Sequence, residues 1–349
     1  MSTDASPNAV PANDTLDPLL RETIEQRFAL YPRLSQCDEM LFSLALERAA
    51  RVKTSHSLPT IEITAQVQPP ISVPLSRMVE AGIKIGTLPS VFHKIVDTVN
   101  SPFSSVQDIA ATIATDPSLS ARLLRLVNSP FYGLPTRIDT ISRAVALVGN
   151  GPLVMLTMGT VLVSAFKGIP STLINMQEFW QHSFSTGACA KTLARHAELE
   201  ESESFFVAGL LHDIGRLIVF LETPENAVAV IMRSREKRVP MRDIEREILG
   251  FTHAELGAAL LKEWHCPAQL IDYVLNHHTP IPGKPMPYEV ILTVADTIVS
   301  ALGHGSSSEF YIANVAPQTW ETLNITPEDL PEIALSVEEH LVILSQMLA

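Results

Sequence analysis

The chain has 349 residues, 46% hydrophobic and 18% charged, so it can bury a sizeable core and wholesale disorder is excluded. At roughly 150 residues per domain, this length suggests one large or two ordinary domains. The formal net charge of −13 disfavours a nucleic-acid binder, which needs basic surface to displace phosphate counterions. The three cysteines lie far apart in the sequence, which indicates a reducing cytoplasm rather than a disulfide framework.

The N-terminal part divides into a tail, a helical extension and a linker. Residues 1–16 are rich in Ser, Asn, Asp, Pro and Ala, and we expect a disordered tail without the features of a signal peptide. In residues 17–75, apolar residues recur at helical spacing and predict two helices broken near Tyr31-Pro32. A proline-rich linker then follows, in which the β-prone run 61–67 leaves room for one short strand.

Residues 76–284 show a helical pattern nearly throughout, and alternating strand patterns are almost absent. Ser104-Ser105 marks a helix start before Asp108. Pro117, directly after Asp116, is typical of a first helical turn. This part is therefore predicted to be one helical domain.

The uncharged stretch 144–166 raises the question of a membrane span. The run Gly149-Asn150-Gly151-Pro152 interrupts it and leaves 14 residues, 153–166, in one piece. Such a helix is about 21 Å long at 1.5 Å per residue, short of the roughly 30 Å hydrocarbon core of a bilayer. We therefore expect two buried helices joined by a turn, and no membrane contact.

Residues 285–349 hold nine acidic residues and no Lys or Arg, so nine of the thirteen net negative charges lie there. We expect an acidic, helical C-terminal region. Two interpretations remain open: a solvated helical cap on the domain, and an acidic segment that binds a partner.

Histidine and acidic residues stand against apolar helical backgrounds at five separate places. They are Glu178 with His182, His212-Asp213, His253, His277-His278, and Asp296. Burying imidazole and carboxylate groups costs several kcal/mol unless they are paired with each other or bound to a metal. Helical bundles build metal sites from inward-projecting residues of facing helices. The alternative is a set of core residues that satisfy one another.

His182, His212-Asp213 and Asp296 follow the order H…HD…D of the HD superfamily of metal-dependent phosphohydrolases. A second block is more specific, and it comprises Leu88-Pro89, 109–117, the run ARLLRLVNSPFYG at 121–133, and 141–149. This block closely resembles the HDOD domain, the HD-related output domain of bacterial signalling proteins, over about residues 85–278. The resemblance implies an all-α, HD-type multi-helix bundle with an N-terminal helical extension, completed by Asp296 of the C-terminal region.

The resemblance also implies a ligand set for divalent metal. Its members are His182, His212, Asp213, His253, His277, His278 and Asp296, with Glu178 as a further carboxylate. Such a set is large enough for two six-coordinate ions bridged by Asp213, and mixed imidazole and carboxylate ligands suit Fe or Mn, with Zn as a further option. Two departures argue against catalysis. Arg216 takes the place of the Lys in HDxGK, and the GYP signature is missing after His277-His278.

Three functions follow from the resemblance. The first is a bacterial signal-transduction module that works through contacts with signalling proteins, with dimerisation through the N-terminal helices left open. The second is a metal-dependent phosphohydrolase of a nucleotide or cyclic dinucleotide, in which Asp213 serves the metals while Arg216 and Lys262 are candidate cations for the phosphoryl oxygens. The third is a metal-loaded nucleotide receptor without turnover.

Overall fold

The computed structural model describes residues 17–52, 71–85, 90–100, 105–129, 132–134, 136–166, 174–200, 202–278, 285–313 and 315–348. Within these ranges every regular element is a helix, which confirms the all-α prediction. The expected tail 1–16 and the candidate strand 61–67 lie outside the described residues. The helices are α1 (Pro18–Arg27), α2 (Gln36–Val52), α3 (Leu75–Ile85), α4 (Ser90–Asn100), α5 (Val106–Ala114), α6 (Pro117–Val127), α7 (Ile141–Val148), α8 (Asn150–Ala165), α9 (Met176–His196), α10 (Ser202–Leu211), α11 (Ile214–Glu222), α12 (Pro224–Lys237), α13 (Met241–Leu249), α14 (His253–Glu263), α15 (Ala268–Asn276), α16 (Pro287–Leu302), α17 (Pro317–Thr322) and α18 (Leu330–Leu348).

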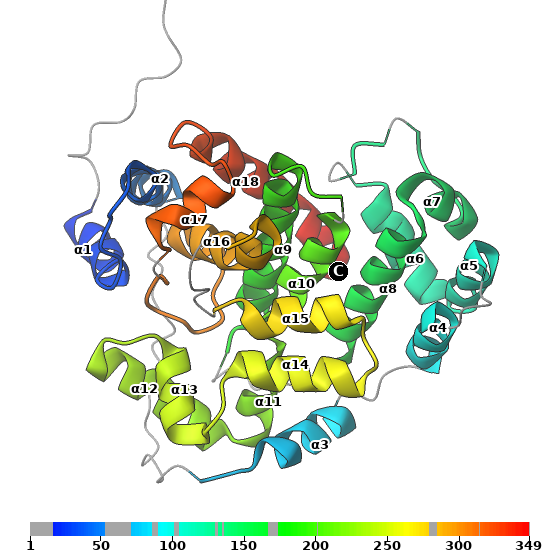
Figure 1. The fold of residues 1–349 in the computed structure, drawn as a ribbon, viewed down its shortest axis with the longest axis horizontal. Helices are drawn as coiled ribbons and strands as arrows, with labels where there is room; N and C mark the ends of the chain where they lie inside the picture. The colour runs from blue at the N-terminus through cyan, green and yellow to red at the C-terminus, as the bar shows by residue number, and fades with distance from the viewer. Residues whose placement is uncertain are drawn as a thin grey trace, which may run out of the picture.

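The centre of the molecule is a group of buried helices around α9 and α10 (Figure 1). Helix α9 packs against α10, α16 and α18, and α14 packs against α11 and α15. Where α9 and α10 cross, a Cβ on Gly209 would lie 2.6 Å from the Cα of Gly187. Only glycine on both helices permits this approach, and it brings the end of α10 close to the buried face of α9.

Helices α4 to α8 form a second group beside the central helices (Figure 1). Its helix ends follow the sequence signals. Ser105 and Asp108 form a capping box at α5, and the Asp116 side chain caps α6, whose first residue is Pro117. In the turn after α6, the Asn128 side chain donates a hydrogen bond to the Ile138 carbonyl at 2.7 Å and accepts one from the Ile138 amide at 2.6 Å. This turn therefore ties α6 to the segment that leads into α7.

The stretch suspected of spanning a membrane is two helices, α7 and α8, that meet at Gly149, where φ is 98°. Within the described ranges, the segment Ser202–Glu222 is long and apolar enough to cross a membrane by length and composition alone. However, 94% of its apolar window is buried inside the protein. It also breaks at His212-Asp213, between α10 and α11.

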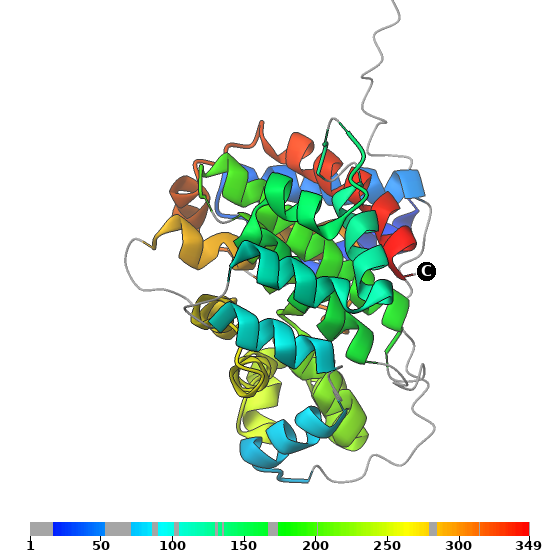
Figure 2. The same ribbon diagram turned by 90° about the vertical axis from the view of Figure 1, so that its right-hand side faces the viewer.

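The two ends of the described chain pack together. Helix α2 lies against α16 and α18, and Figure 2 shows α2 in blue and α18 in red at the same end of the molecule. The predicted break near Tyr31-Pro32 is present, since α1 ends at Arg27 and α2 begins at Gln36. Arg48 and Arg51 of α2 each form an ion pair of 3.1 Å with Glu338 of α18. The acidic C-terminal region is therefore joined to the basic residues of the extension.

Candidate metal centre

Five segments bring histidine and aspartate side chains to one point in the core. We call the following seven residues the candidate metal centre: His182 of α9, His212 and Asp213 between α10 and α11, His253 at the start of α14, His277 and His278 at the end of α15, and Asp296 of α16. All are buried except His278, which is half-buried. The sequence-based expectation that these residues converge is met in the structure.

The local fold around His212-Asp213 explains why the motif lies where two helices meet. Helix α10 ends at Leu211 and α11 begins at Ile214, so both side chains leave the backbone at a break between two apolar helices. A Cβ on Gly215 would overlap the carbonyl oxygen of His253 and lie 2.9 Å from the Gly257 amide nitrogen. Glycine at this position therefore lets α11 touch α14 and places Asp213 beside His253.

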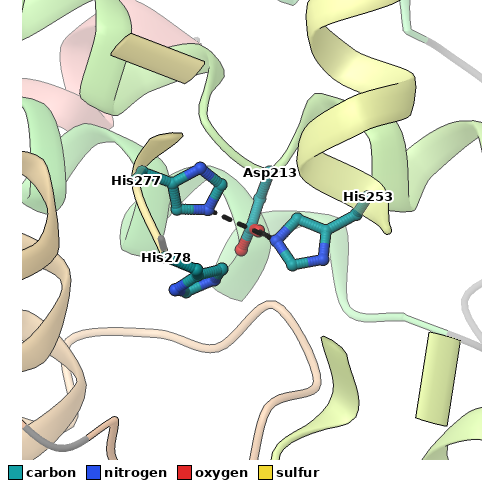
Figure 3. Close-up of side chains that lie close together, drawn as sticks. All are labelled: Asp213, His253, His277 and His278. Atoms are coloured by element: carbon teal, nitrogen blue, oxygen red, sulfur yellow. Dashed lines mark hydrogen bonds and ion pairs between the residues drawn. The ribbon is translucent and has the colours of Figure 1, made fainter. Parts of the chain in front are cut away.

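The first group of side chains in the centre is Asp213 with three histidines, whose imidazoles lie around the Asp213 carboxylate (Figure 3). The Nε2 atom of His253 lies 3.1 Å from Oδ1 of Asp213 and 3.3 Å from Nε2 of His277. The rings of His277 and His278 are 4.0 Å apart, centroid to centroid. The four potential ligand atoms lie within 4.8 Å of one another.

The second group is His182, His212 and the same Asp213, again with ligand atoms within 4.8 Å of one another. The Nε2 atom of His212 lies 3.3 Å from Oδ2 of Asp213, and that of His182 lies 3.2 Å from Oδ1 of Asp296. Asp213 thus presents Oδ1 to the first group and Oδ2 to the second. This is the arrangement that a carboxylate needs if it is to bridge two ions.

Hydrogen bonds fix the tautomers of three histidines. The Nδ1 atoms of His212 and His277 lie 2.6 Å from the carbonyl oxygens of Gly209 and Val274. Because a carbonyl only accepts, Nδ1 carries a proton in both rings, and Nε2 is the nitrogen that a metal could bind. Nδ1 of His253 likewise donates to Oε2 of Glu245, at 2.6 Å. Partners of this kind orient metal-binding histidines in proteins.

The donor set fits a metal on two further observations. Nε2 of His212 and Oδ1 of Asp213 are buried and take part in no hydrogen bond. In addition, the Nε2 atoms of His253 and His277 lie 3.3 Å apart, while the Nδ1 atom of each ring is held by another partner. Two nitrogens bound to one ion at about 2.1 Å and about 100° would lie about 3.2 Å apart. The seven residues therefore offer what a pair of divalent ions requires.

The charges of the centre are strongly coupled. Burial, together with the neighbouring His212 and His253, lowers the pKa of His277 to about 3, so this ring is neutral at neutral pH. Burial opposes protonation of His212 as well, but the Asp213 carboxylate outweighs it and raises the pKa of His212. Asp213 keeps a pKa well below its usual range despite its burial, because Arg216 and two histidines surround it. Similarly, Asp296 is buried, yet its contact with His182 holds its pKa at about 2. The carboxylates are therefore ionised at neutral pH.

Arg216 contacts the residues around the centre, and its charge is paired with carboxylates. Its Nε lies 3.1 Å from Oδ1 of Asp213, and its other nitrogens lie 3.2 Å from the Ser307 carbonyl and 3.7 Å from Oε2 of Glu309. The side chain is only 3% exposed. These contacts account for its charge, and they speak against the expectation that Arg216 holds a phosphoryl oxygen.

Two further predicted site residues lie apart from the centre. Lys262 is exposed, nine residues after His253 on α14. Nine residues correspond to 2.5 turns and about 13 Å of rise, which puts Lys262 on the opposite face. The assignment of Lys262 as a phosphate ligand is therefore wrong. Glu178 lies one turn before His182 on α9, but its carboxylate belongs to neither group of potential ligands.

Residues that the sequence did not single out complete the surroundings. Oε2 of Glu245 accepts hydrogen bonds from Nδ1 and from the amide of His253, at 2.6 and 2.9 Å. The acid stands on the same face of α13 as the buried Met241 and Leu249, which are four residues away on either side. An acid inside an apolar stripe was the signal that could have revealed it.

The centre opens into a narrow cavity of about 20 Å³. Its walls include Asp213, Asp296 and His278 on the side of the centre, together with Ser300, Glu309 and Arg242. Nη1 of Arg242 donates to the His278 carbonyl at 2.6 Å, and its side chain is 31% exposed. Arg216 and Arg242 both line this cavity, and Arg242 is the more exposed of the two, which makes it the better candidate for the phosphoryl contact that the sequence had assigned to Arg216 or Lys262.

Comparison with known proteins agrees with this fold and site. The HDOD domain family matches residues 85–280, more than half of the chain, and the chain belongs to this family. An uncharacterized protein of Treponema pallidum (strain Nichols) is 32% identical over 169 residues, which cover 47% of this chain and 32% of that protein. The chain therefore spans about a third of the length of that relative.

Solved structures share the fold. A protein of Shewanella amazonensis SB2B that carries a phosphohydrolase name has a TM-score of 0.62 at 24% identity, covering 80% of this chain and 99% of that one. A protein of Marinobacter aquaeolei VT8 that is named for signal transduction has a TM-score of 0.57 at 22% identity, covering 86% of this chain and 65% of that one. At these identities the likeness shows a common HD-type helical bundle.

Proposed function

We propose that this protein is a signal-transduction regulator of the HDOD type, which acts through contacts with signalling proteins and keeps a metal-loaded HD-like centre. Membership of the HDOD family supports the regulatory role. The observation that carries the metal is the pair of facing Nε2 atoms of His253 and His277, 3.3 Å apart, with both ring protons held on Nδ1 by other partners.

Each of the two groups of ligands would hold one metal ion. His253, His277 and His278 would hold one ion, His182, His212 and Asp296 the other, and Asp213 would contact both. Neutral imidazoles and ionised carboxylates in one site favour Fe or Mn, and Zn also accepts these donors. Such ions would stabilise the junction of α9, α11, α14, α15 and α16 by an amount set by their affinity.

The second candidate is a metal-dependent phosphohydrolase of a nucleotide or cyclic dinucleotide. It is favoured by the complete ligand set and by Arg242 at the mouth of the cavity. Bound metal would supply a hydroxide at neutral pH, and Arg242 would bind and orient a phosphoryl oxygen. The cavity beside Asp213 and Asp296 holds about 20 Å³, whereas a second hollow, lined by His277, holds about 470 Å³ and is within the roughly 300–1,000 Å³ of ligand pockets.

The test begins with the metal content of protein purified without chelator or His-tag, next to Asp213→Ala. We expect one or two Fe or Mn ions per chain in the wild type and loss of both in the variant, since Asp213 serves both groups. A wild type that stays empty after exposure to Mn²⁺ or Fe²⁺ refutes the metal centre.

The same proteins then separate the two functions. Turnover of a phosphodiester or phosphomonoester panel by the metal-loaded wild type, absent in Asp213→Ala, would replace the regulatory proposal with the phosphohydrolase. We expect no turnover. Activity that persists in Asp213→Ala would come from another source and would exclude this centre as the catalyst.

A further inference from the structure

The segment 303–313, which follows α16, forms one wall of the cavity at the candidate metal centre. Ser307 and Glu309 of this segment both line the cavity and both contact Arg216. Oε2 of Glu309 also accepts a hydrogen bond from the Met241 amide at 2.9 Å. The amide of Ser306 donates to the Glu178 carbonyl in the first turn of α9, at 3.2 Å. The wall is therefore fastened to α9, α11 and α13.

Arg27, the last residue of α1, forms hydrogen bonds both with the end of α16, where this wall begins, and with the far end of the wall. Its Nη2 donates to the Ser300 carbonyl at 2.6 Å, and its Nε donates to the Phe310 carbonyl at 3.4 Å. Its own carbonyl accepts a hydrogen bond from the Ile312 amide at 3.0 Å. One residue of the N-terminal extension thus bridges the end of α16 and the far end of the segment 303–313.

The contact between Arg27 and Ser300 is connected to Asp296, a candidate metal ligand. The Ser300 hydroxyl donates to Oδ1 of Asp296 at 3.3 Å, and the same oxygen lies 3.2 Å from Nε2 of His182. Arg48 of α2 holds the same end of α16, because its Nη1 donates to the Leu302 carbonyl at 2.7 Å. Two guanidinium groups at a helix C-terminus also oppose the negative end of the helix dipole.

We propose that the N-terminal extension, α1 with α2, sets the metal affinity of the centre, and that Arg27 is its positioning residue. Arg27 fixes Ser300, and Ser300 orients the Asp296 carboxylate. This inference rests on the proposed metal centre and concerns how that centre is regulated. A partner protein that separates α1 from residues 300–312 would weaken metal binding. By linkage, metal binding would hold α1 in place by the same free energy.

The experiment measures binding of Mn²⁺ to the full chain by calorimetry, for the wild type, Arg27→Ala, Ser300→Ala and Arg21→Ala. Groups that orient metal ligands typically contribute tenfold to a hundredfold in affinity. We expect roughly tenfold weaker binding for Ser300→Ala and, one step further away, at least threefold for Arg27→Ala. Arg21 is the matched control, because it lies on α1 and pairs with Glu25 at 3.8 Å. We expect wild-type affinity for Arg21→Ala.

Hydrogen exchange of the wild type gives a second measurement that needs no substitution. We expect the amides of α1 to exchange more slowly with Mn²⁺ than with EDTA. If the wild type binds Mn²⁺ but Arg27→Ala binds equally well, or if α1 exchange does not respond to Mn²⁺, the coupling is overturned while the metal centre stands. A wild type that binds no Mn²⁺ overturns the metal centre itself. Should Arg27→Ala fail to fold, the exchange measurement alone decides the coupling.

Discussion

Glu245→Gln is the most direct test of how the centre is held. The Glu245 carboxylate is 3% exposed and accepts two hydrogen bonds from His253, one from Nδ1 and one from the backbone amide. Its negative charge makes Nε2 of His253 a better donor to metal and keeps the proton on Nδ1. Glutamine preserves the shape of the side chain, but it removes the charge and can offer an N–H where the ring needs an acceptor.

The magnitude follows from the role of such partners. Loss of a group that orients a metal-binding histidine reduces affinity about tenfold to a hundredfold, which corresponds to about 1.4–2.7 kcal/mol. Calorimetric titration with Mn²⁺ measures this loss. Glu247→Gln is the matched control, because Glu247 stands on the same helix but is exposed and pairs with Lys237 at 2.6 Å. We expect the control to bind like the wild type. Equal affinities for Glu245→Gln and the wild type would refute the proposed role of Glu245 in orienting His253 for metal binding.

Three other outcomes are expected. Gly215→Ala places a methyl group against the His253 carbonyl, so we expect about 3 kcal/mol of destabilisation and weaker Mn²⁺ binding; an unchanged urea midpoint would contradict the close approach. In metal-free protein, the pKa values of His212 and His253 are raised, so protonation of these rings stabilises the folded state. This stabilisation is fully present below the unfolded pKa of about 6.5 and is lost as pH rises through the folded pKa values. Melting temperature in EDTA should therefore fall from pH 7 to 8, above the range in which the lowered pKa values of His277 and His278 change stability in the opposite sense. With Mn²⁺ it should rise from pH 6 to 8, because the ion displaces the protons on His212 and His253. Lys191→Met removes the cation that lies 2.8 Å from the half-buried Glu203 and should cost about 3 kcal/mol in chemical denaturation; the double variant with Glu203→Gln should recover part of it.

The helical fold was predictable from the pattern of apolar residues. Polar groups beside apolar helices, together with the resemblance to HD proteins, singled out the seven residues that the structure brings together, and also Glu178, which lies apart from them. The prediction for Lys262 did not take into account its distance from His253 along α14, which is 2.5 turns. Glu245, Ser300 and Arg27 were also missed. Glu245 carried a signal, as an acid inside an apolar stripe, but Ser300 and Arg27 resemble ordinary surface residues in the sequence, and only tertiary packing connects them to the centre.

In the acidic C-terminal region, too, the sequence left the partners of charged residues unassigned. Its charge excess left open a solvated cap or a partner-binding segment. In the structure, Asp296 joins the centre, Glu309 contacts Arg216, and Glu338 pairs with Arg48 and Arg51 of the extension. Three of the nine acidic residues therefore serve contacts within the chain. The order H…HD…D predicted the place of Asp296, whereas the partners of Glu309 and Glu338 depend on tertiary packing.

The sharing of Asp213 between two groups of ligands has a consequence for the order in which the centre is made. During synthesis, Asp213, His253, His277 and His278 all leave the ribosome before α16 brings Asp296. Domains begin to fold while later segments are still being added. An ion captured at that stage would be chosen by three imidazoles and one carboxylate, donors that bind Zn²⁺ and Cu²⁺ more tightly than Mn²⁺ or Fe²⁺. Asp296, which is connected through Ser300 to α1, arrives later, so the second group of ligands would be completed only after the first could already hold an ion.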